Sequence, residues 1–266
     1  MLTKRLLTGT GLAVATILAV LFLPVFWFFV LSGVFFLFLA WEFNTLLGIK
    51  DFFIRCAVIF SVVLVGFIIC FYDRYVFTTV LIASLWWLLA AFLVYKYPKF
   101  NLFYNLQSVK FLITIFALAP AFLALNYIVG LSNGRLIILY VFAIVWSMDI
   151  GAYFAGTYFG KRKLLEQVSP KKTYEGLFGG LIASLAVGLL LFFIFSNNYR
   201  IFIYVVAVVL LTAFFAQVGD LFESMLKRQN NIKDVGQYLP GHGGMLDRVD
   251  SLLAALPIFL FLSLLL

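Results

Sequence analysis

The chain has 266 residues, of which 65% are hydrophobic and only 11% are charged, and its mean hydropathy is +1.13. Soluble domains carry roughly 25% charged residues, so this chain cannot cover a water-facing surface. The composition excludes a soluble globular protein and predicts an integral membrane protein. The formal net charge of +8 predicts basic loops beside anionic lipid headgroups, and we expect no nucleic-acid partner.

The apolar segments are long enough to cross a bilayer, because a hydrocarbon core of about 30 Å needs about 20 helical residues. Runs such as VVLVGFIICF lack the alternation of membrane β-strands, so the predicted fold class is all-α and polytopic. Residues 9–49 fit either two spans separated at Pro24 or one re-entrant pair. We expect about nine transmembrane helices, at 6–22, 25–47, 52–71, 75–95, 109–129, 135–158, 176–196, 200–224 and 250–266.

Basic residues predict the orientation of these helices. With a cytoplasmic N-terminus, 16 of the 19 Lys and Arg residues fall on the cytoplasmic side, and the loops at 161–175 and 228–246 face the cytoplasm. The positive-inside rule favours this arrangement, which leaves the C-terminus outside. The three basic residues on the other side are Arg74, Arg135 and Arg200.

The two parts of the chain differ in the charges inside their spans. Residues 1–108 are expected to form a group of N-terminal transmembrane helices with few ionisable side chains. Glu42 is the exception, and because it falls near a predicted cytoplasmic end we interpret it as an interfacial side chain rather than a functional one. Residues 109–266 are expected to form the catalytic transmembrane domain.

Five acidic residues in this second part lie inside predicted spans or close to their ends. A charge there costs several kcal/mol, so each intramembrane acid indicates a functional site. Asp220, Glu223, Ser224 and Lys227 have the spacing i, i+3, i+4, i+7 and therefore share one helical face. The candidate metal ligands are Asp149, Asp220, Glu223, Asp247 and Asp250.

The neighbouring loops supply the opposite charge. The segment GKRKLLEQVSPKKTYEG contains five basic residues in seventeen, and four more lie within 227–248. Between these lies PGHGG, whose glycines would let backbone N–H groups point at an anion. Carboxylates suit Mg²⁺, which shares its coordination sphere with substrate phosphates, and basic side chains suit phosphate oxygens. The pattern predicts a membrane enzyme that handles phosphorylated substrates with Mg²⁺.

Three other classes of protein fit these residues less well. One histidine and two remote cysteines cannot supply a usual zinc site. A Ser-His-Asp hydrolase could use His242, but the chain has no G-x-S-x-G elbow beside it. An ion-coupled transporter also holds acids in its spans, but carriers usually place them near the midplane between repeated halves. Here the acids gather at one predicted end, and the halves do not resemble each other.

The stretch from Ser224 to Asp250 has a long fixed spacing, S-x-x-K-R-x4-K-D-x-G-x2-L-P-x-H-G-G-x-x-D-R-x-D. It resembles the signature of the phosphatidate cytidylyltransferase family, also called CDP-diacylglycerol synthases, at every fixed position. DIGAYFAG and SPKKTYEG are similar to two further family motifs, with Ile150 and Tyr174 where other residues are common. The resemblance is specific over about 145–251.

The resemblance implies transfer of the cytidylyl group of CTP to phosphatidate, which gives CDP-diacylglycerol and pyrophosphate. It also implies Mg²⁺ dependence, a homodimer, and an active site at the cytoplasmic face of what we expect to be a bacterial inner membrane. The alternative within a similar membrane class is a CTP-dependent polyprenol kinase, which would release CDP.

Each signature residue then receives an expected role. Asp220 and Asp247 are the first candidates for metal ligands, and Asp149, Glu223 and Asp250 come after them. His242 would donate to a phosphate oxygen, act as an acid towards pyrophosphate or brace the turn. The expected catalytic residues are Asp220, Lys227, Arg228, His242 and Asp247. The expected substrate-binding residues are Lys171, Lys172, Lys233, Asp234, Gly243, Gly244 and Arg248, with Lys233 and Asp234 ordering the loop.

Overall fold

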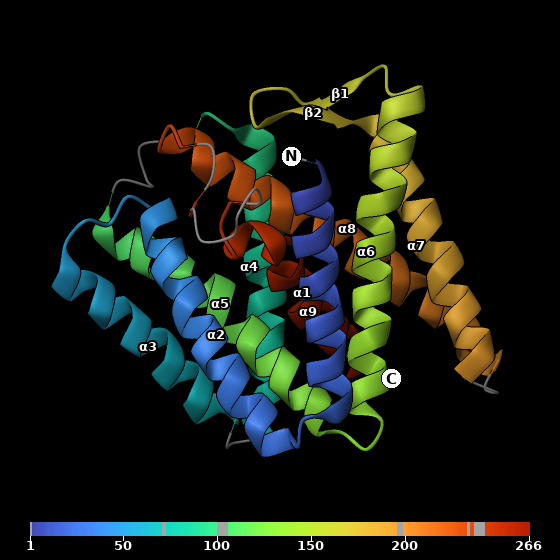
Figure 1. Ribbon diagram of the computed structural model, residues 1–266, viewed down its shortest axis with the longest axis horizontal. Coiled ribbons are helices and arrows are strands. Elements are labelled where there is room, and N and C mark those ends of the chain that lie inside the picture. The colour runs from blue at the N-terminus through green and yellow to red at the C-terminus, as the bar shows by residue number, and fades with distance from the viewer. Residues whose placement is uncertain (1, 71–72, 100–105, 196–198, 233–234, 237–242) are drawn as a thin grey trace.

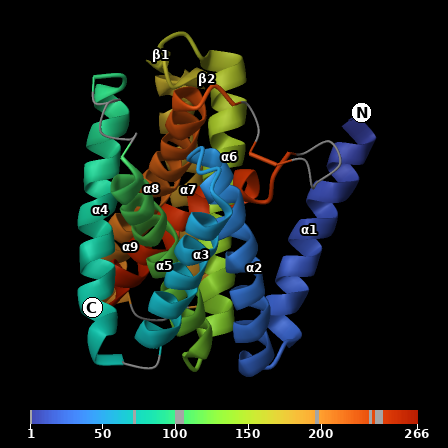
Figure 2. The ribbon, with the colours of Figure 1, turned by 90° about the vertical axis from the view of Figure 1, so that its left-hand side faces the viewer.

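The computed structural model describes the chain except residues 1, 71–72, 100–105, 196–198, 233–234 and 237–242. The described residues form nine α-helices that run alternately up and down a bundle (Figures 1 and 2), so the all-α prediction is confirmed. The helices are α1 (Leu2–Phe22), α2 (Val25–Leu46), α3 (Phe52–Cys70), α4 (Val76–Lys96), α5 (Gln107–Gly130), α6 (Gly134–Phe159), α7 (Tyr174–Phe195), α8 (Phe202–Gln229) and α9 (Asp250–Ser263). Short 3₁₀ turns are η1 (Asp73–Tyr75), η3 (Tyr199–Ile201) and η4 (Leu246–Arg248).

The helix boundaries follow the predicted spans closely, except that α1 begins four residues earlier, α9 ends three residues earlier and α8 ends five residues later than predicted. The sequence predicted a span at 200–224, but α8 continues to Gln229 and includes Lys227 and Arg228 in its last turn. These residues favour helix, and nothing before Asn230 breaks it. The helix ends where Asn231 adopts a φ of 53°.

Six of the described helices are long and apolar enough to cross a membrane: α2, α4, α5, α6, α7 and α8. Three further apolar segments are shorter, Gly9–Phe22, Phe52–Gly66 and Asp250–Ser263. The fold is therefore that of a helical integral membrane protein.

A two-stranded antiparallel hairpin, which the sequence did not predict, covers one end of the bundle (Figure 1). Strands β1 (Lys163–Leu165) and β2 (Ser169–Thr173) pair Lys163 with Thr173 and Leu165 with Ser169. Glu175, at the start of α7, accepts the backbone N–H groups of Lys161 and Arg162 at 3.1 and 3.2 Å. The hairpin thus gives a fixed shape to a segment that composition alone described as a basic loop.

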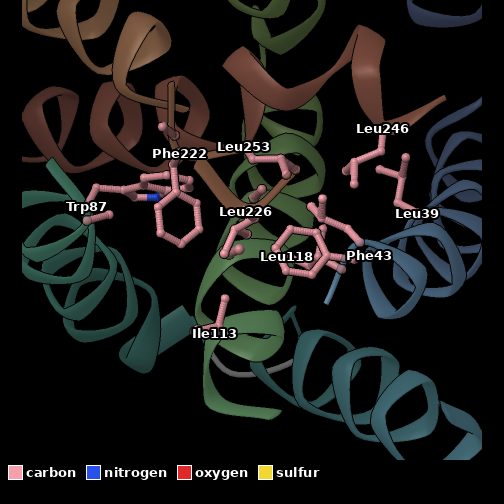
Figure 3. Close-up of a cluster of buried hydrophobic side chains, with 14 of the residues drawn as sticks. Leu39, Phe43, Trp87, Ile113, Leu118, Phe222, Leu226, Leu246 and Leu253 are labelled. Atoms are coloured by element: carbon pink, nitrogen blue, oxygen red, sulfur yellow. The ribbon is translucent and has the colours of Figure 1, made fainter. Parts of the chain in front are cut away.

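The core joins helices from both parts of the chain (Figure 3). Trp87 of α4 is 1% exposed, and its ring meets that of Phe222 from α8 at 5.7 Å and 80°. Phe43 of α2 and Leu246 of η4 belong to the same buried cluster. Burial of an aromatic or leucine side chain contributes about 1.5–3 kcal/mol, so this cluster fixes α2, α4, α8 and η4 relative to one another. The division of the chain at residue 108 stays a prediction.

Small residues let α6 and α7 approach closely. A Cβ added to Gly151 would lie 2.5 Å from the Cβ of Ala183, and one added to Gly179 would overlap the Cβ of Ala155. Gly156 likewise faces Thr173 and the first turn of α7. Such contacts replace the hydrophobic effect as the source of helix association in lipid.

The chain termini lie at opposite ends of the bundle, and the hairpin lies at the N-terminal end (Figures 1 and 2). The C-terminal end of α8 lies towards this end as well. The basic segments that the sequence assigned to the cytoplasmic side therefore gather at one end of the molecule.

We predict that Gly179→Ala destabilises the protein by about 1–3 kcal/mol, because the new methyl group must separate α6 from α7. The matched control is Gly33→Ala in α2, where an added Cβ meets nothing within 4 Å. Alanine favours helix over glycine by roughly 0.5–1 kcal/mol, so the control should be neutral or stabilising. Thermal unfolding of both variants in detergent measures the difference, and equal midpoints would contradict the close packing.

Candidate active site

A cavity of about 760 Å³ opens beneath the hairpin, between α6, α7, α8 and the η4–α9 segment. Four acidic side chains line it: Asp149, Asp220, Asp247 and Asp250. Five basic side chains also line it: Lys163, Lys171, Lys172, Lys227 and Arg248. An apolar bundle thus holds one strongly charged hollow near the end where the basic loops gather.

The C-terminal half of α8 forms one wall of the cavity. Asp220, Ser224 and Lys227 lie on one helical face, as their spacing predicted, and the Ser224 hydroxyl lies 3.4 Å from an Asp220 carboxylate oxygen. Gly219 lets α9 approach this wall, since an added Cβ would lie 2.5 Å from the backbone oxygen of Asp250. The acids of α8 and α9 are therefore brought together at a point of close backbone contact.

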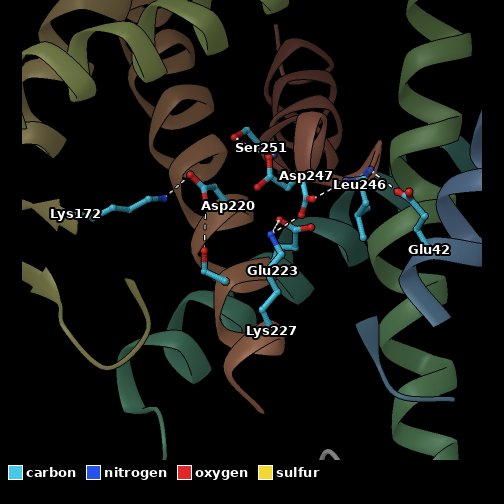
Figure 4. Close-up of polar contacts among 11 residues, drawn as sticks. Glu42, Lys172, Asp220, Glu223, Lys227, Leu246, Asp247 and Ser251 are labelled. Atoms are coloured by element: carbon cyan, nitrogen blue, oxygen red, sulfur yellow. Dashed lines mark hydrogen bonds and ion pairs between the residues drawn. The ribbon is translucent and has the colours of Figure 1, made fainter. Parts of the chain in front are cut away.

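Two lysines neutralise the acids across the cavity (Figure 4). Lys172 from β2 pairs with Asp220 at 2.5 Å. Lys227 of α8 bridges Glu223 at 2.9 Å and Asp247 at 2.5 Å. The side chains of Glu223 and Asp247 are only 4% and 8% exposed, so each depends on this one cation for much of its compensation.

The remaining acids have less compensation. The Asp250 carboxylate accepts the backbone N–H of Ser251 at 2.8 Å and contacts the Glu223 carboxyl group. Asp149 faces the cavity from α6 and interacts electrostatically with Asp250 and Asp220. Opposing carboxylates repel unless a proton or cation lies among them, so this wall attracts positive charge.

The remaining predicted residues take different positions. Lys171 is exposed on the hairpin and Arg248 is exposed beside η4, and both line the cavity. Arg228 instead donates from Nε to the backbone oxygen of Val168 at 3.2 Å, which ties α8 to the hairpin. The sequence also predicted roles for His242, Lys233 and Asp234, and these three residues lie outside the described part of the chain.

Gly243 and Gly244, the last two residues of the PGHGG segment, are glycines for separate structural reasons. Gly243 has a φ of 80°, in the left-handed region that favours glycine. The Gly244 N–H is donated to the Asp247 carboxylate at 2.8 Å, so it satisfies a protein group rather than facing the cavity as a free donor.

Sequence reasoning missed several residues of the site. Lys163 lines the cavity from the start of β1, and Ser251 lines it from the first turn of α9. Gln217 lies three residues before Asp220, and its buried side-chain nitrogen has no hydrogen-bond partner within the described part of the chain. The helical spacing of Gln217 with Asp220 and Ser224 was the signal that could have identified it.

The interpretation of Glu42 as an interfacial side chain is wrong. Glu42 is 1% exposed, and its carboxylate accepts the backbone N–H groups of Met245 at 3.1 Å and Leu246 at 2.6 Å. A lone acid in a 22-residue apolar helix was a signal of this, because it needs a specific partner when buried.

Fold and site together define a membrane-embedded enzyme whose charged cavity can bind anionic substrates and a hard cation. Lysines at the mouth suit phosphate oxygens, and carboxylates on the inner wall suit cations. Among the described His, Cys, Asp and Glu residues, no three are grouped closely enough to form a ready-made metal site.

Comparison with known proteins identifies the family. Residues 3–266 match the model of the cytidylyltransferase family, and the chain belongs to that family. A phosphatidate cytidylyltransferase of Pseudomonas aeruginosa is 39% identical over 242 residues, which cover 87% of this chain and 89% of that protein. One of Haemophilus influenzae is 42% identical over 185 residues, covering 65% of this chain and 64% of that protein. The resemblance seen in the sequence and the assignment as a nucleotidyltransferase are confirmed.

Lys227→Met is expected to destabilise the protein strongly, because Glu223 and Asp247 then lose their shared cation while remaining buried. Breaking a buried ion pair by removing one partner typically costs about 3–5 kcal/mol. Adding Glu223→Gln to the same variant should recover part of the loss. Lys171→Met, at an exposed lysine of the same cavity, is the control and should change stability by about 0.5 kcal/mol or less. Unfolding in detergent measures all three, and a K227M protein as stable as the control would contradict this account.

Proposed function

We propose that this protein transfers the cytidylyl group of CTP to phosphatidate and releases pyrophosphate, as part of phospholipid biosynthesis. The observation that carries the proposal is the cavity of acids and lysines at one end of an apolar bundle. A water-soluble nucleotide and the phosphate group of a membrane lipid could both reach this cavity. Membership of the cytidylyltransferase family and the names of the relatives favour this reaction over phosphorylation of a polyprenol and over transport.

The main task of the site is to bring two anions together. An oxygen of the phosphatidate phosphate attacks the α-phosphorus of CTP, and the bond to pyrophosphate breaks. At about 4 Å, one pair of unit charges repels by roughly 4 kcal/mol at an effective dielectric constant near 20. Lys163, Lys171, Lys172, Lys227 and Arg248 line the cavity and would offset this repulsion. Electrostatic stabilisation and positioning then lower the barrier without a covalent enzyme intermediate.

The inner wall of the cavity suits Mg²⁺. Asp149, Asp220 and Asp250 all line the cavity and interact electrostatically, with Lys172 as the cation paired to Asp220. Mg²⁺ prefers one or two carboxylates and takes its other ligands from water and phosphate, so a complete protein cage is not required. Asp247 is a further candidate ligand, and Glu223 lies behind it against Lys227. When bound, the ion would neutralise charge on the transferring phosphoryl group.

We further propose nine membrane-spanning helices with a cytoplasmic N-terminus. The alternation of α1 to α9 supports this count, and the gathering of basic segments at the N-terminal end supports the orientation (Figure 1). The cavity would then open towards cytosolic CTP in a bacterial inner membrane. We also expect a homodimer, for which the exposed apolar side chains of α7, such as Phe178 and Ile182, offer a surface within the bilayer.

The purified protein is expected to convert radiolabelled CTP and phosphatidate into CDP-diacylglycerol and pyrophosphate, and to use ATP poorly. Asp220→Asn and Asp247→Asn should each reduce turnover by at least about two orders of magnitude, which corresponds to roughly 3 kcal/mol of barrier. Product analysis by thin-layer chromatography, with a pyrophosphate assay, measures both expectations.

The control is Asp51→Asn, which changes an exposed carboxylate that accepts the N–H of Ile54 at the start of α3. It should leave turnover unchanged. Release of CDP in place of pyrophosphate would indicate a kinase, and near-normal turnover in both cavity variants would remove these residues from the site.

The orientation has its own test in intact bacterial cells. With Cys56 and Cys70 replaced by serine, a cysteine at exposed Gln167 of the hairpin should react with an impermeant maleimide only after permeabilisation. A cysteine at exposed Ser132, in the turn between α5 and α6, should react without it. The reverse pattern would overturn the proposed orientation.

A further inference from the structure

Glu42 is a carboxylate inside the apolar core rather than in the charged cavity. It belongs to α2, is 1% exposed, and lies beside the buried Phe43 and Leu39 of the same helix. In the described part of the chain it forms no ion pair with lysine or arginine. Burying a charge without such a partner is costly unless hydrogen bonds replace the lost water.

The replacement comes from the backbone at the start of η4. Glu42 accepts the N–H of Met245 on one carboxylate oxygen and that of Leu246 on the other, at 3.1 and 2.6 Å (Figure 4). The first N–H groups of a helical turn lack partners within the turn and carry partial positive charge. Glu42 therefore caps η4 from a helix about 200 positions earlier in the chain.

Glycine at position 244 is what allows this contact. A Cβ added to Gly244 would lie 2.9 and 3.0 Å from the two oxygens of the Glu42 carboxylate, and 3.0 Å from the backbone nitrogen of Gly236. Such distances are tighter than nearly all real Cβ contacts, so a side chain here would push the carboxylate away. The second glycine of the HGG motif thus has a partner in α2.

The same turn positions Asp247. One oxygen of Asp247 accepts the N–H of Gly244 at 2.8 Å, and the other pairs with Lys227 at 2.5 Å. Three consecutive N–H groups, of residues 244, 245 and 246, are therefore held by two carboxylates, one from within the turn and one from α2. Leu246 is fully buried in the core, so the turn has little freedom to rotate while Glu42 is bound.

We propose that Glu42 is a positioning residue for the reaction: it holds the turn at 244–248 so that Asp247 and Arg248 face the cavity. The inference rests on the proposed function for its catalytic consequence, since Asp247 is there a cavity residue. Glu42 does not line the cavity and would touch neither substrate.

The test uses the full-length protein in detergent with Glu42→Gln. The amide keeps the shape of the side chain but offers one acceptor, and its NH₂ group meets the other backbone N–H donor. We expect kcat to fall by about 10- to 100-fold, a range typical of disturbed positioning, with KM for CTP and phosphatidate within twofold of wild type. Hydrogen exchange at Met245 and Leu246 should quicken at least tenfold.

Asp51→Asn is the matched control, because it alters another carboxylate that accepts a backbone N–H at the start of a helix. It should leave kcat and the exchange of residues 245 and 246 at wild-type values. An E42Q protein with normal kcat, or with faster exchange throughout the bundle, would overturn the positioning role.

Gly244→Ala disturbs the contact between the Glu42 carboxylate and residue 244 without changing Glu42. It therefore serves as the test if the E42Q protein fails to fold. It should lower kcat in the wild-type background but cause a smaller loss in the presence of Glu42→Ala, because the carboxylate is then gone and only the contact with the Gly236 nitrogen remains. If the fold-loss in kcat of the double variant equals the product of the losses in the two single variants, the proposal is overturned. Absence of cytidylyl transfer in the unmodified protein would instead reject the proposed function, and the exchange measurement would still report whether Glu42 holds the turn.

Discussion

The constraint on which the rest of this structure depends is the cost of carboxylates inside an apolar bundle. Each acid must find a cation, a backbone donor or water, since lipid and packed side chains offer none of these. Lys172 meets Asp220, and Lys227 meets both Glu223 and Asp247. The positions of these partners determine where α8, the hairpin and η4 can lie.

The negative charge of the buried carboxylates is compensated differently on the two sides of η4. On the cavity side, lysine side chains meet the acids, and substrates or ions could displace them because they are flexible. On the core side, Glu42 is bound by backbone N–H groups, which cannot leave without unwinding the turn. The site thus combines exchangeable charges towards the cavity with fixed hydrogen bonds towards the core.

Much of the fold could be predicted because lipid restricts the chain to helices of a defined length. The nine predicted segments are helical in the structure, six of them long and apolar enough to cross a membrane, and the spacing of Asp220, Ser224 and Lys227 correctly predicted one helical face. The hairpin was missed because its strands are only three and five residues long and neither shows the apolar–polar alternation of a half-buried strand. The end of α8 was placed five residues early because polarity alone does not end a helix.

The sequence by itself determined the class of protein, the local spacing of the acids and the signature that indicates the family, because these depend on composition and on neighbours along the chain. Only the tertiary structure decided which charges meet. Lys172 and Asp220 come from segments separated by α7, and Glu42 reaches Leu246 across most of the chain. Such pairs arise from how helices pack, and the packing depends on contacts such as Gly219 against α9 that no local pattern specifies.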